Sequence, residues 1–301
     1  MNNPTTRTAT PEQVIKILLA DPKDRIQLDD HVTELLRSTL ATLGSDRFAN
    51  SSVPTAETIA SQLKRYEEAT ADLLTAVVLL GRWGLPEHRP LLEKILLRLA
   101  EANKSVGGSY VFWSAMRWYP LSLLIYGAGM AALSAQNYTM FGPLFQSWLP
   151  SEHRRGARDE VTVRVQNQMN ELSDAFKMLA GHERDYVPRS EHFFVVLREP
   201  LDRMLFLGDG YERLFDEFEI ISALAFADLT YEERQRVWAA PGRFGYKSRS
   251  SGGPYTAFVE NALRQGDDWP LLKLGLFRSS AARFQEIAKG YTALLSQMNW
   301  Y

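Results

Sequence analysis

The amino-acid sequence predicts an all-α protein made of stacked helical hairpins, either an α-solenoid-like stack or an irregular multi-helix bundle. Apolar residues recur at three- and four-residue steps along most of the 301-residue chain, which is the spacing of one face of an α-helix. One stretch, residues 118–151, contains no Asp, Glu, Lys, Arg or His, whereas charged residues crowd both of its flanks. A charge-free centre between amphipathic segments predicts that the core forms around that stretch.

The N-terminal third of the chain carries clear helix signals. Thr10 stands in an N-cap position before Pro11 and a capping-box Gln13, so a helix should begin at residue 11. Helical spacing resumes over residues 28–43. Residues 55–102 then predict a helical hairpin, because two apolar stripes flank a turn rich in glycine and proline.

The charge-free stretch predicts a second hairpin, with one helix from about residue 120 to 136, a turn at Asn137 and a second helix to about residue 148. Small residues on the first helix should let another helix approach closely; they are Gly127, Ala128, Gly129, Ala131 and Ala132. Its continuous apolar run is about 15 residues, shorter than the roughly 20 of a membrane-spanning helix. We therefore expect a buried helix and no membrane partner.

The C-terminal half also predicts helices. Residues 161–179 carry one apolar stripe, and residues 211–229 form a strong helix that is apolar on most sides. The run HFFVVL at residues 192–197 has the composition of a strand or of a buried helix, and either reading is open. Pro200 is expected to start a short helix that ends near residue 207.

The last elements are predicted from capping and apolar spacing. Thr230 and Glu233 have the spacing of a capping box, which predicts a helix that runs to Trp238. Two final helices are expected over residues 255–264 and 279–300.

The domain organisation follows from the polar, basic link at residues 150–157. This link predicts a boundary between an N-terminal helical lobe, residues 11–150, and a C-terminal helical lobe, residues 151–301, packed together as one unit. Residues 1–10 are expected to form a flexible tail.

A family resemblance lies within the charge-free stretch. The order of small and aromatic residues there resembles a degenerate tetratricopeptide-like helical hairpin over about 30 residues; the matching positions are Tyr126, Gly129, Ala131, Asn137, Tyr138 and Phe145. The resemblance implies a stack of helical hairpins. The hairpins are also similar in style to helical regions that stand beside enzymatic domains in bacterial antiviral defence systems.

The composition excludes several kinds of chemistry. The 34 Lys and Arg residues nearly balance the 36 Asp and Glu residues, so no global field favours nucleic acid or an anionic membrane. The absence of cysteine excludes disulfides, thiolate metal sites and cysteine nucleophiles. The polar N-terminus has no apolar run of signal-peptide length, so we expect a bacterial cytoplasmic protein.

Sequence motifs for catalysis are also missing. The five histidines form no HExxH or ExxH pattern and no short histidine pair, so no metal ligand set is predicted. The chain has no GxSxG, no GxxxxGK[ST] and no GxGxxG after a strand. We therefore predict no catalytic residues, no metal and no cofactor from motifs.

Two carboxylates on the helix at residues 211–229 form one candidate for chemistry. Asp216 and Glu219 are three residues apart and so share a helix face, where paired carboxylates could divide acid and base roles. The alternative is a solvated helix edge that pairs with Arg213 or another basic group.

The irregular segment at residues 236–255 is the second candidate, because basic and aromatic residues alternate there without an acidic residue. Guanidinium groups and aromatic faces on a glycine-rich backbone suit phosphates and unstacked bases. The predicted contact residues are Arg236, Arg243, Phe244, Tyr246, Lys247 and Arg249. The alternative is an ordinary surface loop whose aromatic side chains pack on neighbouring helices.

Together these observations predict a helical interaction subunit, an adaptor or partner that binds another protein or itself, in an antiviral defence assembly. Abundant helix-packing signals without a catalytic constellation favour this reading. Nucleic-acid or nucleotide binding through residues 236–255 is one alternative. A carboxylate-dependent enzyme that uses Asp216 and Glu219 is the other.

Overall fold

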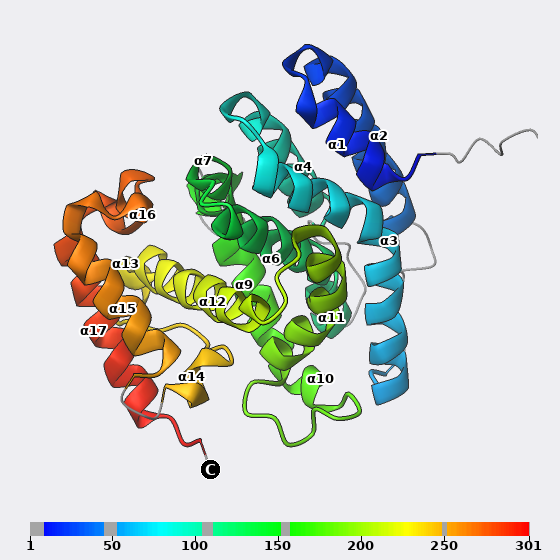
Figure 1. Cartoon of the computed structure of the whole chain (residues 1–301). Helices are drawn as coiled ribbons and strands as arrows, with labels where there is room; N and C mark the ends of the chain where they lie inside the picture. The colour runs from blue at the N-terminus through cyan, green and yellow to red at the C-terminus, as the bar shows by residue number, and fades with distance from the viewer. Residues whose placement is uncertain (1–8, 45–52, 104–110, 152–156, 249–251, 301) are drawn as a thin grey trace, which may run out of the picture.

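The computed structural model describes residues 9–44, 53–103, 111–151, 157–248 and 252–300, and most of them lie in α-helices (Figure 1). The helices of the first half are α1 (Pro11–Ala20), α2 (Arg25–Leu43), α3 (Ala56–Trp83), α4 (Arg89–Ala102), α5 (Val111–Met116), α6 (Tyr119–Ser134), α7 (Tyr138–Phe141) and α8 (Pro143–Gln146). Those of the second half are α9 (Val161–Glu171), α10 (Ser173–Lys177), α11 (Pro188–Leu205), α12 (Gly210–Leu229), α13 (Tyr231–Arg234), α14 (Phe244–Lys247), α15 (Pro254–Gln265), α16 (Pro270–Lys273) and α17 (Ala281–Gln297). The prediction of an all-α, multi-helix arrangement is confirmed.

The described residues also include short elements of other types. Strands β1 (Trp148–Pro150) and β2 (Arg158–Glu160) pair antiparallel. Short 3₁₀ turns occur at Pro22–Asp24, Pro86–His88, Gly266–Asp268 and Leu276–Ser279.

Helix α6 lies at the centre of the protein, in contact with α3, α9, α11 and α12 (Figure 1). Its small residues allow these contacts to be close. A Cβ added to Gly81 of α3 would lie 2.5 Å from the carbonyl oxygen of Ala128, and a Cβ added to Gly129 would overlap the ring of Phe218 on α12. The predicted close approach of helices to the small-residue face of α6 is therefore confirmed.

The first helix begins where the capping signals predict, and the N-terminal helices pack on α3. The Thr10 hydroxyl accepts a hydrogen bond from the Gln13 backbone N–H, and the Gln13 side chain accepts one from the Thr10 N–H. Helices α1 and α2 both contact α3. Helix α4 packs on α2, α6 and α8 rather than back along α3, so the predicted hairpin over residues 55–102 was wrong.

The second hairpin differs from the prediction after its turn. Asn137 caps α7 through a bond from the Met140 N–H, and its side-chain amide donates to the carbonyl of Gly84 at 2.8 Å. The prediction of a single helix to residue 148 was wrong: α7 ends at Phe141, α8 ends at Gln146 and the chain then enters β1. The break falls before Pro143, because proline has no N–H to continue the α7 ladder.

Residues 192–197 lie inside the long helix α11, so the helical reading of HFFVVL is confirmed and the extended one is wrong. Phe193, Leu197 and Leu201 are buried at four-residue intervals, and this helical stripe outweighs the strand-like composition. The prediction that a separate helix starts at Pro200 was wrong, because Pro200 lies within α11. The helix ends at Leu205, because the backbone of the next residue, Phe206, is left-handed at φ 57° and ψ 51°.

The predicted capping box at Thr230 does not form. Thr230 itself has helical backbone angles, and its hydroxyl donates to the carbonyl of Phe226 at 2.8 Å rather than accepting from α13. Helix α13 ends at Arg234 because Gln235 adopts a left-handed conformation, so the expected helix to Trp238 was wrong.

The buried apolar side chains of both halves of the chain belong to one cluster. Helix α6 packs against α9, α11 and α12, across the boundary predicted at residues 150–157. The division into two lobes stays a prediction, and residues 152–156 and most of the predicted tail lie outside the described residues. Within the described ranges, none of the helices combines the length and apolar character needed to cross a membrane.

Candidate functional site

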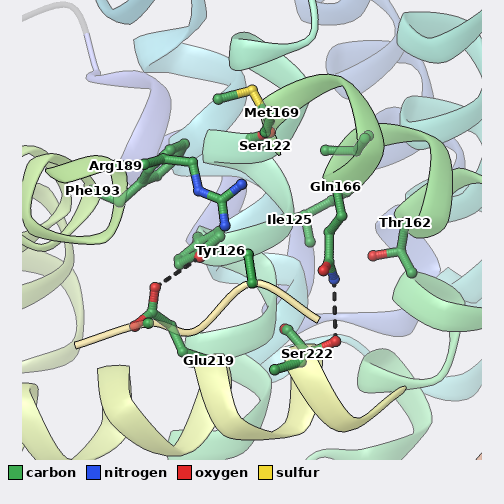
Figure 2. A pocket seen from close by; sticks show the side chains of 14 residues that line it. Ser122, Ile125, Tyr126, Thr162, Gln166, Met169, Arg189, Phe193, Glu219 and Ser222 are labelled. Carbon is green, nitrogen blue, oxygen red and sulfur yellow. Dashed lines mark hydrogen bonds between the residues drawn. The ribbon is translucent and has the colours of Figure 1, made fainter. Parts of the chain in front are cut away.

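A cavity lies where α6, α9, α11 and α12 meet, beside the chain segment that follows α13 (Figure 2). Its volume is about 540 Å³ including the opening to solvent. Water-sized groups can be centred in about 40 Å³ of it, which is room for about three water molecules. The polar lining residues come from four different elements: Ser122, Tyr126, Thr162, Gln166, Arg189, Glu219 and Ser222. A molecule that fits this cavity is therefore small and polar.

Glu219 of α12 is the buried carboxyl of the cavity, with 4% of the residue exposed. Its Oε1 accepts a hydrogen bond from the Tyr126 hydroxyl at 3.0 Å. Its Oε2 accepts from the Ser190 hydroxyl at 2.7 Å and from the Arg243 backbone N–H at 3.0 Å. Burial raises the pKa of Glu219 to about 7, against the opposing effect of the bonds from Ser190 and Tyr126. Both protonation states are thus populated near neutral pH.

Residues 239–247, here called the strap, form one wall of the cavity through Ala240 and Gly242. The strap passes so close to α12 that a Cβ at Gly242 would overlap the carboxyl group of Glu219. Glycine is therefore required at this position for the backbone N–H of Arg243 to reach the carboxyl.

An ionic network holds the strap to α11 and α12. The Lys247 ammonium contacts Asp216 at 2.7 Å and Glu212 at 2.6 Å. The Arg243 guanidinium pairs with Glu191 at 2.8 Å and lies 3.4 Å from the centre of the Phe194 ring. These charge pairs and the cation–π contact fix the strap over the cavity.

The residues predicted to contact nucleic acid are thus brought together only in part. The cations of Arg243 and Lys247 face carboxylates of the same chain, and the Tyr246 hydroxyl donates to Glu191 at 2.7 Å. Phe244 is buried. Arg236 is exposed, and Arg249 lies outside the described residues. Nucleic-acid binding by this segment stays a prediction.

The carboxylates of Asp216 and Glu219 are both buried, so the reading of a solvated helix edge was wrong. They belong to different networks, however. Asp216 pairs with Lys247, whereas, among the described residues, the groups that donate hydrogen bonds to Glu219 are all uncharged. Of the two, only Glu219 lines the cavity. The two carboxyl groups therefore do not form the acid and base pair that their spacing suggested.

Arg189 and Ser122 complete the cavity, and sequence reasoning missed both. The Arg189 guanidinium points into the cavity (Figure 2) and donates to the Asn170 side-chain oxygen at 2.7 Å. Among the described residues, its side chain has no other hydrogen bond and no ion pair. The Ser122 hydroxyl is buried and has no hydrogen-bond partner in the described part of the chain. Ser122 interrupts the apolar run of α6, a signal that could have marked it, but no local pattern marks Arg189.

A second polar cluster joins α3, α6 and α11. The Tyr119 hydroxyl donates to Glu67 at 2.8 Å and lies 2.8 Å from Nε2 of His192. These bonds satisfy polar groups that burial would otherwise leave unpaired. In the part of the chain that the structure describes, no group of three or more His, Asp or Glu side chains could hold a metal ion.

Comparisons with known proteins give no relative of this chain. No family model, no curated protein and no solved structure matches it. The resemblance to a tetratricopeptide-like hairpin therefore stays a prediction, and the function is argued from the cavity.

Proposed function

We propose that this protein is a carboxylate-dependent enzyme that binds a small polar molecule in the cavity and uses Glu219 to transfer a proton to or from it. The observation that carries the proposal is a buried carboxyl with a pKa of about 7 in the wall of a cavity. A general acid or base works best when its pKa lies near the working pH. Strongly shifted carboxyl groups in cavities are also concentrated at functional sites.

The hydrogen bonds of Glu219 support this role. A carboxylate offers about four acceptor positions. The chain occupies three of them with the Tyr126 hydroxyl, the Ser190 hydroxyl and the Arg243 N–H. The remaining acceptor position belongs to Oε1, the oxygen that Tyr126 contacts. The carboxyl group is thus held rigidly, and its open acceptor position can receive a hydrogen bond, and then the proton, from a ligand.

A screen of small polar molecules by thermal unfolding tests the proposal. A bound ligand at about 100 times its Kd stabilises the folded state by about 2.7 kcal/mol, so a rise in Tm marks binding. We expect at least one compound to raise the Tm of the wild-type protein and to be turned over with a pH profile that inflects near pH 7.

The matched variants separate the cavity carboxyl from its neighbour. Glu219→Gln should abolish turnover, whereas Glu217→Gln should leave turnover intact, because Glu217 is on the same helix but does not line the cavity. Turnover that survives in Glu219→Gln would eliminate the proposed role of this carboxyl.

An interaction subunit is the second candidate, favoured by the side chain of Phe206. It is 96% exposed, on a residue whose left-handed backbone is unfavourable for a bulky side chain. A solvent-exposed aromatic ring on a residue with an unfavourable backbone conformation favours a docking role for the end of α11.

A photo-crosslinking amino acid at position 206 tests this second candidate. In the native host it should yield a discrete crosslinked product with another protein or a second copy. The same probe at Leu263, an exposed apolar position on α15, serves as the control. If position 206 gives no more product than position 263, Phe206 is not a docking residue.

A further inference from the structure

We infer that the ligand of the cavity is a small hydroxycarboxylate, with its carboxylate bound by Arg189 and its hydroxyl directed to Glu219. This inference rests on the proposed function and names the substrate class of the same site. It is carried by the side-chain contacts of Arg189, Ser122 and Glu219.

The charge of Arg189 is not balanced by an ion pair within the described residues. Arg189 always carries a positive charge, and no described carboxylate pairs with it. Its charge acts on Glu219, since it lowers the pKa of that carboxyl, but the two side chains form no ion pair. The cavity therefore contains a cation whose counter-ion the described part of the chain does not supply.

The position of Arg189 in its helix also favours an anion. Arg189 lies in the first turn of α11, where the helix dipole already makes the potential positive. The N-cap residue, Val187, provides no side-chain acceptor for the free N–H groups of this turn. The carboxylate of this turn, Glu191, is paired with Arg243. An anion bound beside Arg189 would therefore be favoured both by the guanidinium and by the helix dipole.

Ser122 places a second polar group without a partner in the cavity wall, among the described residues. Only 3% of this residue is exposed, and its hydroxyl has no hydrogen-bond partner although it lines the cavity. A buried polar group without a partner is unfavourable by about 1–3 kcal/mol. A polar ligand atom in the cavity would supply the missing partner.

The class of anion follows from charge and size. The planar fork of a guanidinium matches a carboxylate with two parallel hydrogen bonds. A phosphate dianion would leave one negative charge without a cation, close to Glu219. The small free volume also limits the ligand to a few heavy atoms. A hydroxyl group next to the carboxylate of the ligand can donate a hydrogen bond to the open acceptor position of Glu219.

Lactate is the probe for the experiment, with three comparison compounds. Lactamide lacks the negative charge, propionate lacks the hydroxyl, and inorganic phosphate replaces the carboxylate. Titration calorimetry on the full chain should show binding of lactate and weaker binding of all three others. Equal affinity for lactamide, or tighter binding of phosphate, would overturn the inference.

Variants locate the binding groups. Arg189→Met should weaken lactate binding at least tenfold, because it removes a charge-assisted hydrogen bond. Ser122→Ala should weaken it several-fold without lowering stability, since the hydroxyl has no partner among the described residues. Arg198→Met, on the same helix but outside the cavity, should not change the affinity. Unchanged affinity in both Arg189→Met and Ser122→Ala would place lactate elsewhere.

The outcome for Glu219→Gln separates this inference from the proposed function. Suppose that wild-type protein and Glu219→Gln both bind lactate and that neither turns it over. The ligand class then stands and the catalytic proposal falls. If wild-type protein turns over a neutral compound and Arg189→Met does so equally well, the inference falls and the catalytic proposal stands.

Discussion

Glu219→Gln should remove a pH dependence of the free energy of unfolding that the wild-type protein shows between about pH 4.5 and pH 7. Because the folded protein holds the Glu219 proton more tightly than the unfolded chain does, the folded state binds more protons in this window. Stability therefore falls as the pH rises. The stabilising contribution is fully present below pH 4.5, the ordinary value, and is lost above a pH of about 7. Its size is about 3 kcal/mol.

The glutamine variant lacks this contribution but can keep the hydrogen bonds. Its amide oxygen can accept from Ser190 and from the Arg243 N–H, and its amide nitrogen can donate to the Tyr126 hydroxyl. Urea unfolding at several pH values between 4.5 and 8 measures the difference between variant and wild type. Glu233→Gln, at an exposed glutamate of α13, should follow the wild-type curve. Parallel curves for Glu219→Gln and wild type would contradict the raised pKa.

Gly129→Leu is expected to lower the free energy of unfolding by about 1 to 3 kcal/mol, at the upper end of that range. Even a Cβ at this position would overlap the Phe218 ring, so the added side chain must push α6 and α12 apart. The displacement would also disturb the cavity, because Tyr126 and Glu219 stand on these two helices. Equilibrium unfolding in urea measures the loss.

Gly210→Leu is the matched control for this substitution. Gly210 also lies in a helix, at the start of α12, but nothing is within 4 Å of a Cβ added there. Its substitution should change stability by no more than about 0.5 kcal/mol. Equal stability of Gly129→Leu and wild type would show that the contact between α6 and α12 is not tightly packed.

The helices could be predicted from the sequence where burial follows a helical period. The charge-free stretch identified α6 as the central helix because few polar groups can be buried unpaired. The wrong predictions of helix ends lie at positions where a single residue such as proline can either break a helix or be accommodated in it. Pro200 is accommodated within α11, whereas Pro143 stands at a break between helices. Sequence spacing alone does not distinguish these cases, because packing against the remainder of the protein decides them.

Of the residues that form the candidate site, sequence analysis predicted only Glu219 on α12. The spacing of Asp216 and Glu219 marked that helix, but the other groups that define the cavity come from α6, α9, α11 and the strap. Tyr126 is 93 residues from Glu219 in sequence. Pairings over such separations depend on tertiary packing. For the same reason, the basic character of Arg243 and Lys247 did not reveal that carboxylates of α11 and α12 neutralise them.

The contact between the strap and Glu219 restricts substitutions at residue 242 much more than at the adjacent residue 243. The donor at residue 243 is a backbone N–H, which every amino acid except proline provides. The side chain at 243 can therefore change without removing that bond to the carboxyl. Residue 242 has no such latitude, because any side chain there would occupy the space of the Glu219 carboxyl. The chemistry of the cavity thus depends on a glycine that contributes no functional group of its own.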